Sequence, residues 1–283
     1  MITAFLDSWA LFQDAYLAGW LIGLLLSLIG VFVVARDQIF IGAAVSQASL
    51  FGIAVGIWSG SLLATAGWWQ SEWFHAVMGG LFAVLAAFVT ARAAHRGGRE
   101  TPEAVTGWVF LVSTSGSILL MSHNRLGMEE INRLLSSTII GAHRQDVWIF
   151  LGLTILTAVV LSLKCRSVVL IALEPEMARV AGLRVGLWNA LLSAWLGIVI
   201  GFAIHVSGVV YTFASLVLPA LIAKNLGRTA RSLFFLAPCV SLATGVIAFV
   251  IANHFDFPPG QTAAACLCAL LAGAWILRAV KPR

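Results

Sequence analysis

Apolar stretches of about 20 residues recur from one end of this chain to the other, and they constrain its fold more than any other feature. A helix of that length crosses the hydrocarbon core of a lipid bilayer, which is about 30 Å thick. Two adjoining stretches could also form one kinked or re-entrant helix, so we expect eight or nine spans. The predicted fold is all-α, with residues 1–283 forming a single transmembrane helical bundle. The nine candidate spans are residues 15–35, 38–58, 74–94, 104–122, 146–164, 186–205, 207–224, 232–253 and 259–280.

Composition excludes a soluble domain of useful size. The chain is 60% hydrophobic and only 10% charged, whereas soluble domains carry about 25% charged residues. A net charge of +5 would suggest nucleic-acid binding in a soluble protein, but here the basic residues stand in short loops between apolar stretches. We therefore expect membrane lipid, and no nucleic acid, around this chain.

The loop charges predict an orientation in the membrane. Fourteen of the 17 Lys and Arg residues stand in alternate connections and in the C-terminal tail. The remaining three, Arg125, Arg133 and Arg144, share one long segment on the other side. Positive residues resist translocation, so the larger group marks the cytoplasm. The N-terminus is then outside and the C-terminus inside, which favours an odd number of spans.

The connection over residues 165–185, on the cytoplasmic side, contains a predicted short helix. Pro175 after Glu174 suits the first turn of a helix, and Glu176 suits the positive end of its dipole. Gly182 supplies the stop. These residues alone fit a connector on the membrane surface as well as a docking element for a partner.

The same segment resembles the D-P-E-x-A-x-x-x-G segment of the metal-ion permease family of ABC importers, the zinc, manganese and iron permeases. Glu174 stands where the family usually has Asp, while Glu176, Ala178 and Gly182 are in register. Other segments resemble the family in order, and together they cover nearly the whole chain. They are Gly30–Arg36 with Phe40–Gly42, Leu134-Leu135 through Ile140-Gly141 to Asp146, Ser207–Ala220 and Asp256–Gly260.

The resemblance implies a function and a set of partners. The chain would be the permease of an ATP-driven importer for zinc, manganese or iron, working by alternating access as a multi-pass protein of the bacterial inner membrane. Its partners would be a second permease copy, cytoplasmic ABC ATPases and an extracytoplasmic solute-binding protein. ATP and Mg²⁺ would bind the ATPase and no cofactor would bind this chain, which has no phosphate-binding loop and is not expected to be an enzyme. The expected ATPase-coupling residues are Glu174, Pro175, Glu176, Ala178, Arg179 and Gly182.

The chain departs from the family at the motif that carries the family's metal-binding residues, G-D-A-x-S-H in the second span. In the family the Asp and His lie four residues apart, on one helix face, where both can bind a divalent cation. Here the segment reads Gly42-Ala43-Ala44-Val45-Ser46-Gln47, so both ligands are missing. The metal ligands are therefore unknown, and the candidate residues of the translocation pathway are Ser46, Gln47 and His205.

Three explanations of this departure stay open. The ion could pass a weak site of carbonyls, hydroxyls and Gln47, which we favour, or the substrate could be a metal chelate or another small polar solute. Alternatively, His205 or Glu129 and Glu130 could act as displaced ligands. An ion-driven secondary transporter is a less favoured class, because such proteins place ionisable residues at the membrane midplane and none is evident here.

Overall fold

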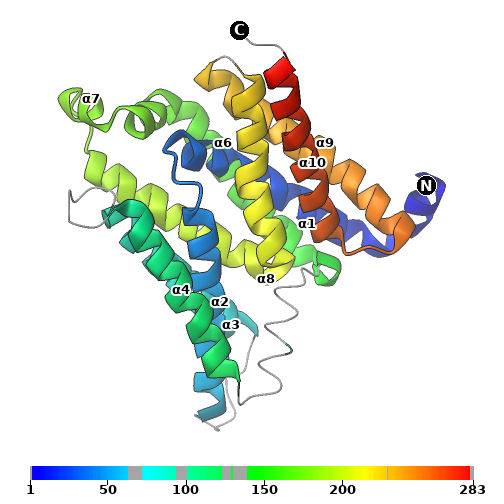
Figure 1. Ribbon diagram of the computed structural model, residues 1–283. Helices are drawn as coiled ribbons and strands as arrows, with labels where there is room; N and C mark the ends of the chain where they lie inside the picture. The colour runs from blue at the N-terminus through cyan, green and yellow to red at the C-terminus, as the bar shows by residue number, and fades with distance from the viewer. Residues whose placement is uncertain are drawn as a thin grey trace. The chain divides into compact units, whose positions relative to one another are not determined.

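The computed structural model describes residues 2–62, 72–93, 101–122, 129, 139–227 and 229–280. Within these residues the chain is helical and contains no strand (Figure 1). Eight of the described helices are long and apolar enough to cross a membrane. The elements are α1 (Ile2–Ala35), α2 (Ile41–Leu62), α3 (Glu72–Ala93), α4 (Pro102–Met121), η2 (Ile139–Gly141), α6 (Arg144–Leu173), α7 (Pro175–Val180), α8 (Val185–Leu226), α9 (Ala230–Phe255) and α10 (Pro259–Val280).

The chain divides into two compact units. The first unit combines Met1–Asp37, Ser136–Leu173 and Val206–Arg283, and the second combines Gln38–Leu135 and Glu174–His205. The boundary between His205 and Val206 falls inside α8, so this helix contributes its first half to one unit and its second half to the other.

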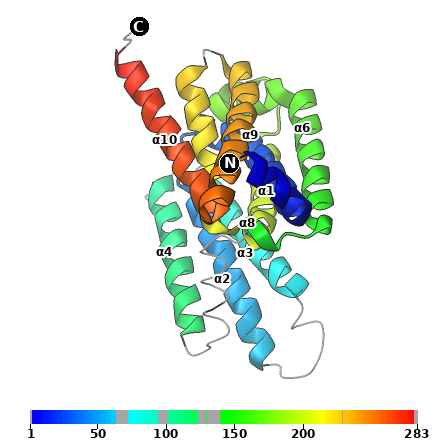
Figure 2. The ribbon, with the colours of Figure 1, turned by 90° about the vertical axis from the view of Figure 1, so that its right-hand side faces the viewer.

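In the first unit, α1 packs against both α6 and α9, and α10 packs against α9 (Figure 2). The second half of α8 approaches α1 at backbone distance, because a Cβ added at Gly30 would overlap the carbonyl oxygen of Leu216. Elsewhere along the same pair of helices, the buried Tyr211 hydroxyl donates a 2.8 Å hydrogen bond to the carbonyl of Gly19. Small residues thus let these helices approach closely enough for a buried polar bond between them.

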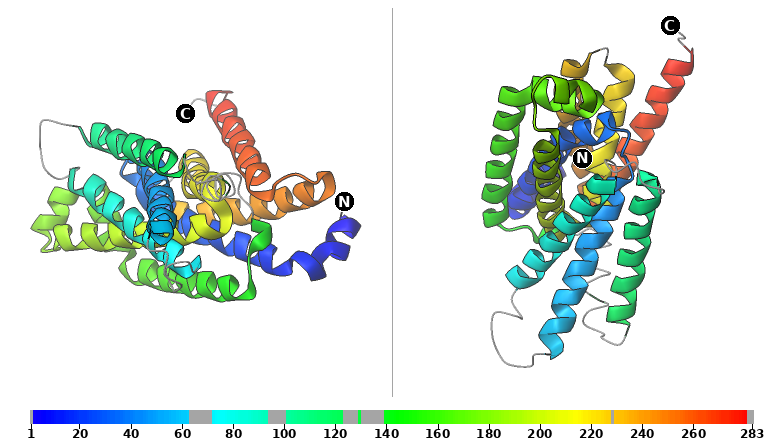
Figure 3. Two further views of the ribbon diagram at one scale, coloured as in Figure 1. Left: turned by 90° about the horizontal axis from the view of Figure 1, so that it is seen from below. Right: turned by 90° about the vertical axis from the view of Figure 1, so that its left-hand side faces the viewer.

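In the second unit, α2 packs against α3 and α4 (Figure 3). A Cβ at Gly52 would overlap the carbonyl oxygen of Met78 on α3. The first half of α8 also approaches α3 at backbone distance. A Cβ added at Gly201 would lie 2.6 Å from Gly80 Cα. Both α2 and α8 are therefore fixed against α3 by contacts that only small residues allow.

The predicted spans 186–205 and 207–224 lie together in α8, which is 42 residues long. The helix is interrupted at Gly208, whose φ of 77° and ψ of 172° are not helical. Eight of the described helices are candidate spans, which is the lower of the two expected numbers. The number is eight and not nine because α8 contains two of the predicted stretches.

Two further boundaries differ from the prediction. α1 begins at Ile2, well before residue 15. α6 passes a kink at Lys164, where φ is −116° and ψ is 15°, and continues to Leu173. Residues 165–173 of the predicted connection are therefore helical, because the apolar run Val168–Leu173 carries the helix on beyond the charged residues.

Candidate coupling helix and translocation residues

α7 is the short helix that the sequence predicts between two long spans. Pro175 occupies its first turn. At its end, the N–H of Leu183 donates to the carbonyl of Ala178 and the N–H of Gly182 donates to that of Arg179, both at 3.0 Å. This pair of bonds is a Schellman motif, for which the left-handed φ of +80° at Gly182 is required. The predicted helix and its glycine stop are confirmed.

One surface of α7 exposes apolar side chains. Met177 is 60% exposed and Val180 is 87% exposed, and residues three apart lie on the same side of a helix. Ala178, by contrast, is fully buried. Two exposed apolar side chains on one side of a short connecting helix mark a candidate interaction surface.

The charged residues of α7 interact with each other. Arg179 Nη1 lies 2.7 Å from Glu176 Oε1, and both side chains are mostly exposed. Glu174 is the N-cap residue, yet its side chain makes no cap hydrogen bond. The ion pair therefore adds little to the stability of the helix, because an exposed i,i+3 pair contributes about 0.2–1 kcal/mol.

Ala43 and Gln47 lie one turn apart on the same face of α2, and both are partly buried. Phe51 continues this face by one more turn. Its ring meets that of Phe82 on α3 edge-on, with the centroids 5.4 Å apart, and also contacts α4, where a Cβ at Gly116 would lie 2.7 Å from it. The face that carries Gln47 is thus directed between α3 and α4 in the second unit.

α2 also carries two buried hydroxyls away from this face, and the hydroxyl of Ser49 lies against Gly79 of α3. Ser46 and Ser49 are 0% exposed, and neither Oγ has a hydrogen-bond partner in the described residues. Helical serines usually bond a carbonyl of the preceding turn, as Ser27 does with Leu24 at 2.8 Å. An unpaired buried hydroxyl is costly, and α2 carries two of them, at Ser46 and Ser49. Ser49 is a candidate that the sequence motif does not single out.

His205 lies near the interruption of α8 and is half-buried. Just beyond it, the hydroxyls of Ser207 and Thr212 are 3.1 Å apart, and the Thr212 hydroxyl donates to the carbonyl of Gly208 at 2.7 Å. These bonds satisfy polar groups at the point where the helix is broken. The buried pair Ser207–Thr212 has no counterpart in the sequence prediction, because it depends on the irregular backbone at Gly208.

No metal site is assembled in the part of the chain that the structure describes. Within it, no three His, Cys, Asp or Glu side chains come together in a way that could hold a metal ion. Of the alternative ligands, Glu129 is exposed, and Glu130 lies outside the described residues together with Leu134 and Leu135 of the family resemblance.

The sequence profile of the ABC 3 transport family matches residues 8–278, almost the full length of the chain. This chain belongs to the ABC 3 transport family. It is a multi-pass membrane permease subunit of a bacterial ABC transporter and not a catalytic subunit.

Relatives of this ABC 3 permease are similar over most of their length. "Manganese transport system membrane protein MntC" of Halalkalibacterium halodurans is 25% identical over 261 residues, covering 90% of this chain and 82% of the relative. "Chelated iron transport system membrane protein YfeD" of Yersinia pestis is 25% identical over 275 residues, covering 95% and 86%. A solved structure, "PsaBC from Streptococcus pneumoniae in complex with Fab", superimposes with a TM-score of 0.79 at 19% identity, covering 97% of this chain and 95% of the other. The last comparison shows a shared fold.

Basic residues of the ABC 3 permease meet at one end of its first unit. Lys224 Nζ, near the end of α8, lies 3.0 Å from Asp37 Oδ1, just beyond α1. Arg278 Nη1, at the end of α10, donates to Asn225 Oδ1 at 3.0 Å. The Arg36 guanidinium lies 4.4 Å from the centre of the Phe32 ring, and burial lowers the pKa of Arg36 to about 10, which leaves it charged at neutral pH.

Proposed function

We propose that this chain is the permease of an importer for a divalent metal ion, with manganese and iron as the first candidates. The observation that carries the proposal is the family match over residues 8–278, together with relatives named for manganese and for chelated iron. A metal chelate is the alternative substrate, because the family's Asp and His positions are occupied by Ala43 and Gln47.

The proposed assembly contains two copies of the permease, cytoplasmic ABC ATPases that bind ATP and Mg²⁺, and an extracytoplasmic solute-binding protein. The C-terminus of the permease lies in the cytoplasm. Support comes from Arg36, Lys224 and Arg278, which stand at the ends of three different helices but at the same end of the first unit. A shared side is what the positive-inside rule requires of these residues.

The two halves of α8 cross the membrane separately in this proposal, which gives nine crossings. A continuous helix of 42 residues would measure about 63 Å, roughly twice the hydrocarbon thickness. The interruption at Gly208 leaves a segment of suitable length on each side. Nine crossings place the two termini on opposite sides, as the distribution of Lys and Arg predicts.

α7 is the proposed site of contact with the ATPase. Its predicted coupling residues all lie in or beside one short helix, in which Ala178 is buried and which Gly182 closes. The exposed Met177 and Val180 would supply the apolar contact, and the pair Glu176–Arg179 would shape the helix without binding the partner. Motion of the ATPases would then reach the spans through both ends of α7, which join α6 and α8.

The substrate would pass the second unit in contact with neutral oxygen donors. Gln47 offers an amide oxygen on a half-buried face, and Ser46 and Ser49 offer unpaired hydroxyls. Neutral oxygen donors bind hard cations such as Mn²⁺ weakly and suit zinc poorly. A weak site is compatible with transport, because a permease must also release its substrate.

The test is uptake by the complete complex in proteoliposomes. We expect ⁵⁴Mn²⁺ uptake that requires the solute-binding protein and ATP on the ATPase side, and that is unaffected by dissipating ion gradients. Uptake without ATP, driven by a proton or sodium gradient, would instead identify a secondary transporter. Uptake of a chelated metal without uptake of the free ion would show that the chelate, and not the ion, is the substrate.

A further inference from the structure

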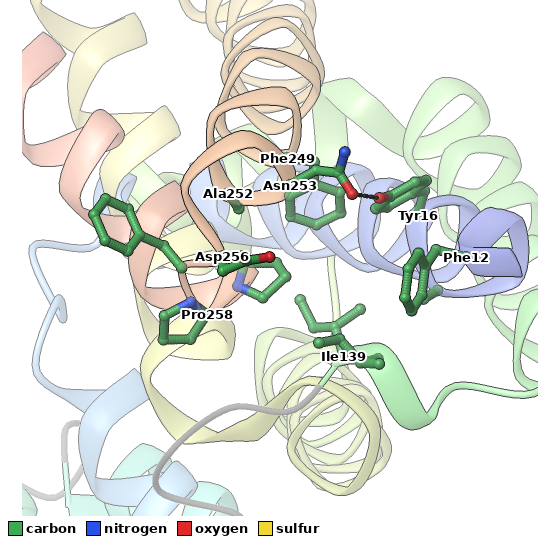
Figure 4. Close-up of a pocket in the computed structure, with 12 residues that line it drawn as sticks. Phe12, Tyr16, Ile139, Phe249, Ala252, Asn253, Asp256 and Pro258 are labelled. Atoms are coloured by element: carbon green, nitrogen blue, oxygen red, sulfur yellow. Dashed lines mark hydrogen bonds between the residues drawn. The ribbon is translucent and has the colours of Figure 1, made fainter. Parts of the chain in front are cut away.

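A cavity of about 350 Å³ opens at one end of the first unit. α1, η2, α9 and the turn into α10 line it (Figure 4). The cavity lies at the N-terminal ends of α1 and α10. Arg36 follows the C-terminal end of α1 and Arg278 is in the last turn of α10, so the cavity lies away from the basic end of this unit. Its volume falls within the range of about 300–1,000 Å³ that is typical of small-molecule sites.

Aromatic rings form much of the cavity wall. Phe12 and Tyr16 come from α1 and Phe249 from α9, and the rings of Tyr16 and Phe249 pack with their centroids 5.9 Å apart. Tyr16 and Phe249 are buried, so their positions are fixed by packing. The faces of such rings carry partial negative charge and attract cations.

A hydrogen bond orients two polar side chains of the cavity, Tyr16 and Asn253. The Tyr16 hydroxyl donates its proton to Asn253 Oδ1 at 3.1 Å, and Ser8 donates to the same oxygen at 3.0 Å. The hydroxyl proton of Tyr16 is thus engaged, and Asp256 is the one acidic side chain among the described residues that line the cavity. Asp256 lies across the cavity from Phe12 and Tyr16 (Figure 4), and no ion pair to its carboxylate is present among the described residues.

The backbone holds Asp256 in place at the cavity. Asp256 is the C-cap of α9 in the left-handed conformation, with φ of 54°, and its N–H donates to the carbonyl of Ala252. The N–H of Phe257 bonds the same carbonyl at 3.0 Å, and two prolines, Pro258 and Pro259, then restrict the turn. The C-terminus of α9 adds the negative end of a helix dipole, which also favours a cation.

We propose that this cavity binds an organic ammonium ion with an apolar body. Its charge lies against Asp256, and its apolar part lies against Phe12 and Tyr16, whose packing is backed by the buried Phe249. Carboxylate and aromatic faces together recognise alkylated ammonium groups, whereas the rings supply no further ligands for a bare metal ion. The amine headgroup of a phospholipid and a free organic amine share this chemistry.

The test measures binding of tetraethylammonium to the complete transporter complex by isothermal titration calorimetry. We expect saturable binding that weakens at least about tenfold in Asp256→Asn, the effect of losing one charged partner. Asparagine tolerates the left-handed conformation, so the C-cap is preserved. Asp14→Asn is the control, because Asp14 lies on α1 outside the cavity lining, and it is expected to bind like the parent. Absent binding in the parent, or equal affinity in Asp256→Asn, overturns the proposal.

Phe12→Leu provides a second variant, which keeps an apolar side chain but removes a ring. It is expected to weaken binding severalfold, and unchanged affinity would contradict a role for the aromatic wall. Thermal unfolding of each variant checks the fold, and Phe12→Leu decides if Asp256→Asn proves unstable. Nanodiscs then identify the source of the cation. Weaker tetraethylammonium binding in phosphatidylethanolamine than in phosphatidylglycerol assigns the cavity to the lipid headgroup, and equal binding assigns it to a free amine.

Discussion

Met177 and Val180 are apolar side chains that the fold leaves exposed, whereas their charged neighbours Glu176 and Arg179 bind each other. The predicted coupling residues include Glu174, Glu176 and Arg179 but neither Met177 nor Val180. Exposure shows which side chains gain from contact with a partner. For α7, the gain lies with the apolar pair.

Replacing Met177 and Val180 together by serine is therefore expected to weaken binding of the ATPase. Burial of each apolar side chain is worth about 1.5–3 kcal/mol, so the double variant should lose at least about tenfold in affinity. Glu176→Gln, which breaks an exposed pair worth about 0.2–1 kcal/mol, should change affinity only slightly. Biolayer interferometry of the permease in nanodiscs against the ATPase measures both. A larger loss in Glu176→Gln than in the double variant would show that charge dominates the contact.

Ala43 and Gln47 allow a second experiment on single residues. The variant Ala43→Asp with Gln47→His places a carboxylate and an imidazole one turn apart on the same face of α2. We expect it to retain Zn²⁺ or Mn²⁺ through purification and to transport Mn²⁺ more slowly, because a tighter site releases its ion less readily. Metal analysis by mass spectrometry and ⁵⁴Mn²⁺ uptake are the readouts, with Ala43→Asp alone as control. Equal metal content in the double variant and in this control would place the pathway away from this face.

At the scale of secondary-structure elements, the two glycines with positive φ in the described residues have different structural roles. Gly182 closes α7 at φ of +80°, and Gly208 interrupts α8 at φ of 77° with ψ of 172°. The first conformation suits a helix C-terminus and is also open to asparagine. The second belongs to a region that is essentially restricted to glycine.

Asparagine substitutions should separate these two cases. Gly182→Asn is expected to cost little, since asparagine adopts the left-handed conformation and no atom crowds the site. Gly208→Asn is expected to destabilise the protein by about 1–3 kcal/mol, because the backbone must strain or rearrange. Thermal unfolding in detergent compares the two variants with the parent. Equal loss of stability in both would mean that the interruption of α8 tolerates an ordinary helical backbone.

At the scale of the whole molecule, orientation in the membrane is the prediction that governs all partner assignments. It rests on loop charge, and seven of the 17 basic residues lie outside the described part of the structure. The described ones at the ends of α1, α8 and α10 nevertheless share one end of the first unit.

Cysteine labelling tests this orientation. In a chain whose four cysteines are replaced, Gln13→Cys should react with an impermeant maleimide in intact spheroplasts, and Glu103→Cys should not. Both positions are exposed in the structure. Inside-out vesicles should give the opposite pattern, because they present the cytoplasmic face to the reagent. Labelling of Glu103→Cys in spheroplasts would invert the proposed topology and would place α7 outside the cell.

The sequence by itself determined that the chain is a membrane helix bundle with a short capped helix in one connection. Apolar length, proline at a helix start and glycine at a helix end act locally, so each can be recognised within a window of some twenty residues. The resemblance of the motifs then indicated the family correctly, and the family match over residues 8–278 confirmed it.

Only the tertiary structure decided which side chains meet. The exposure of Val180, the unpaired hydroxyl of Ser49 and the meeting of Phe12 and Tyr16 with Asp256 at one cavity depend on residues distant in sequence. The kinks at Lys164 in α6 and at Gly208 in α8 likewise became visible only in the structure. A local pattern specifies where a helix can form, but packing against other helices decides where it bends and what it exposes.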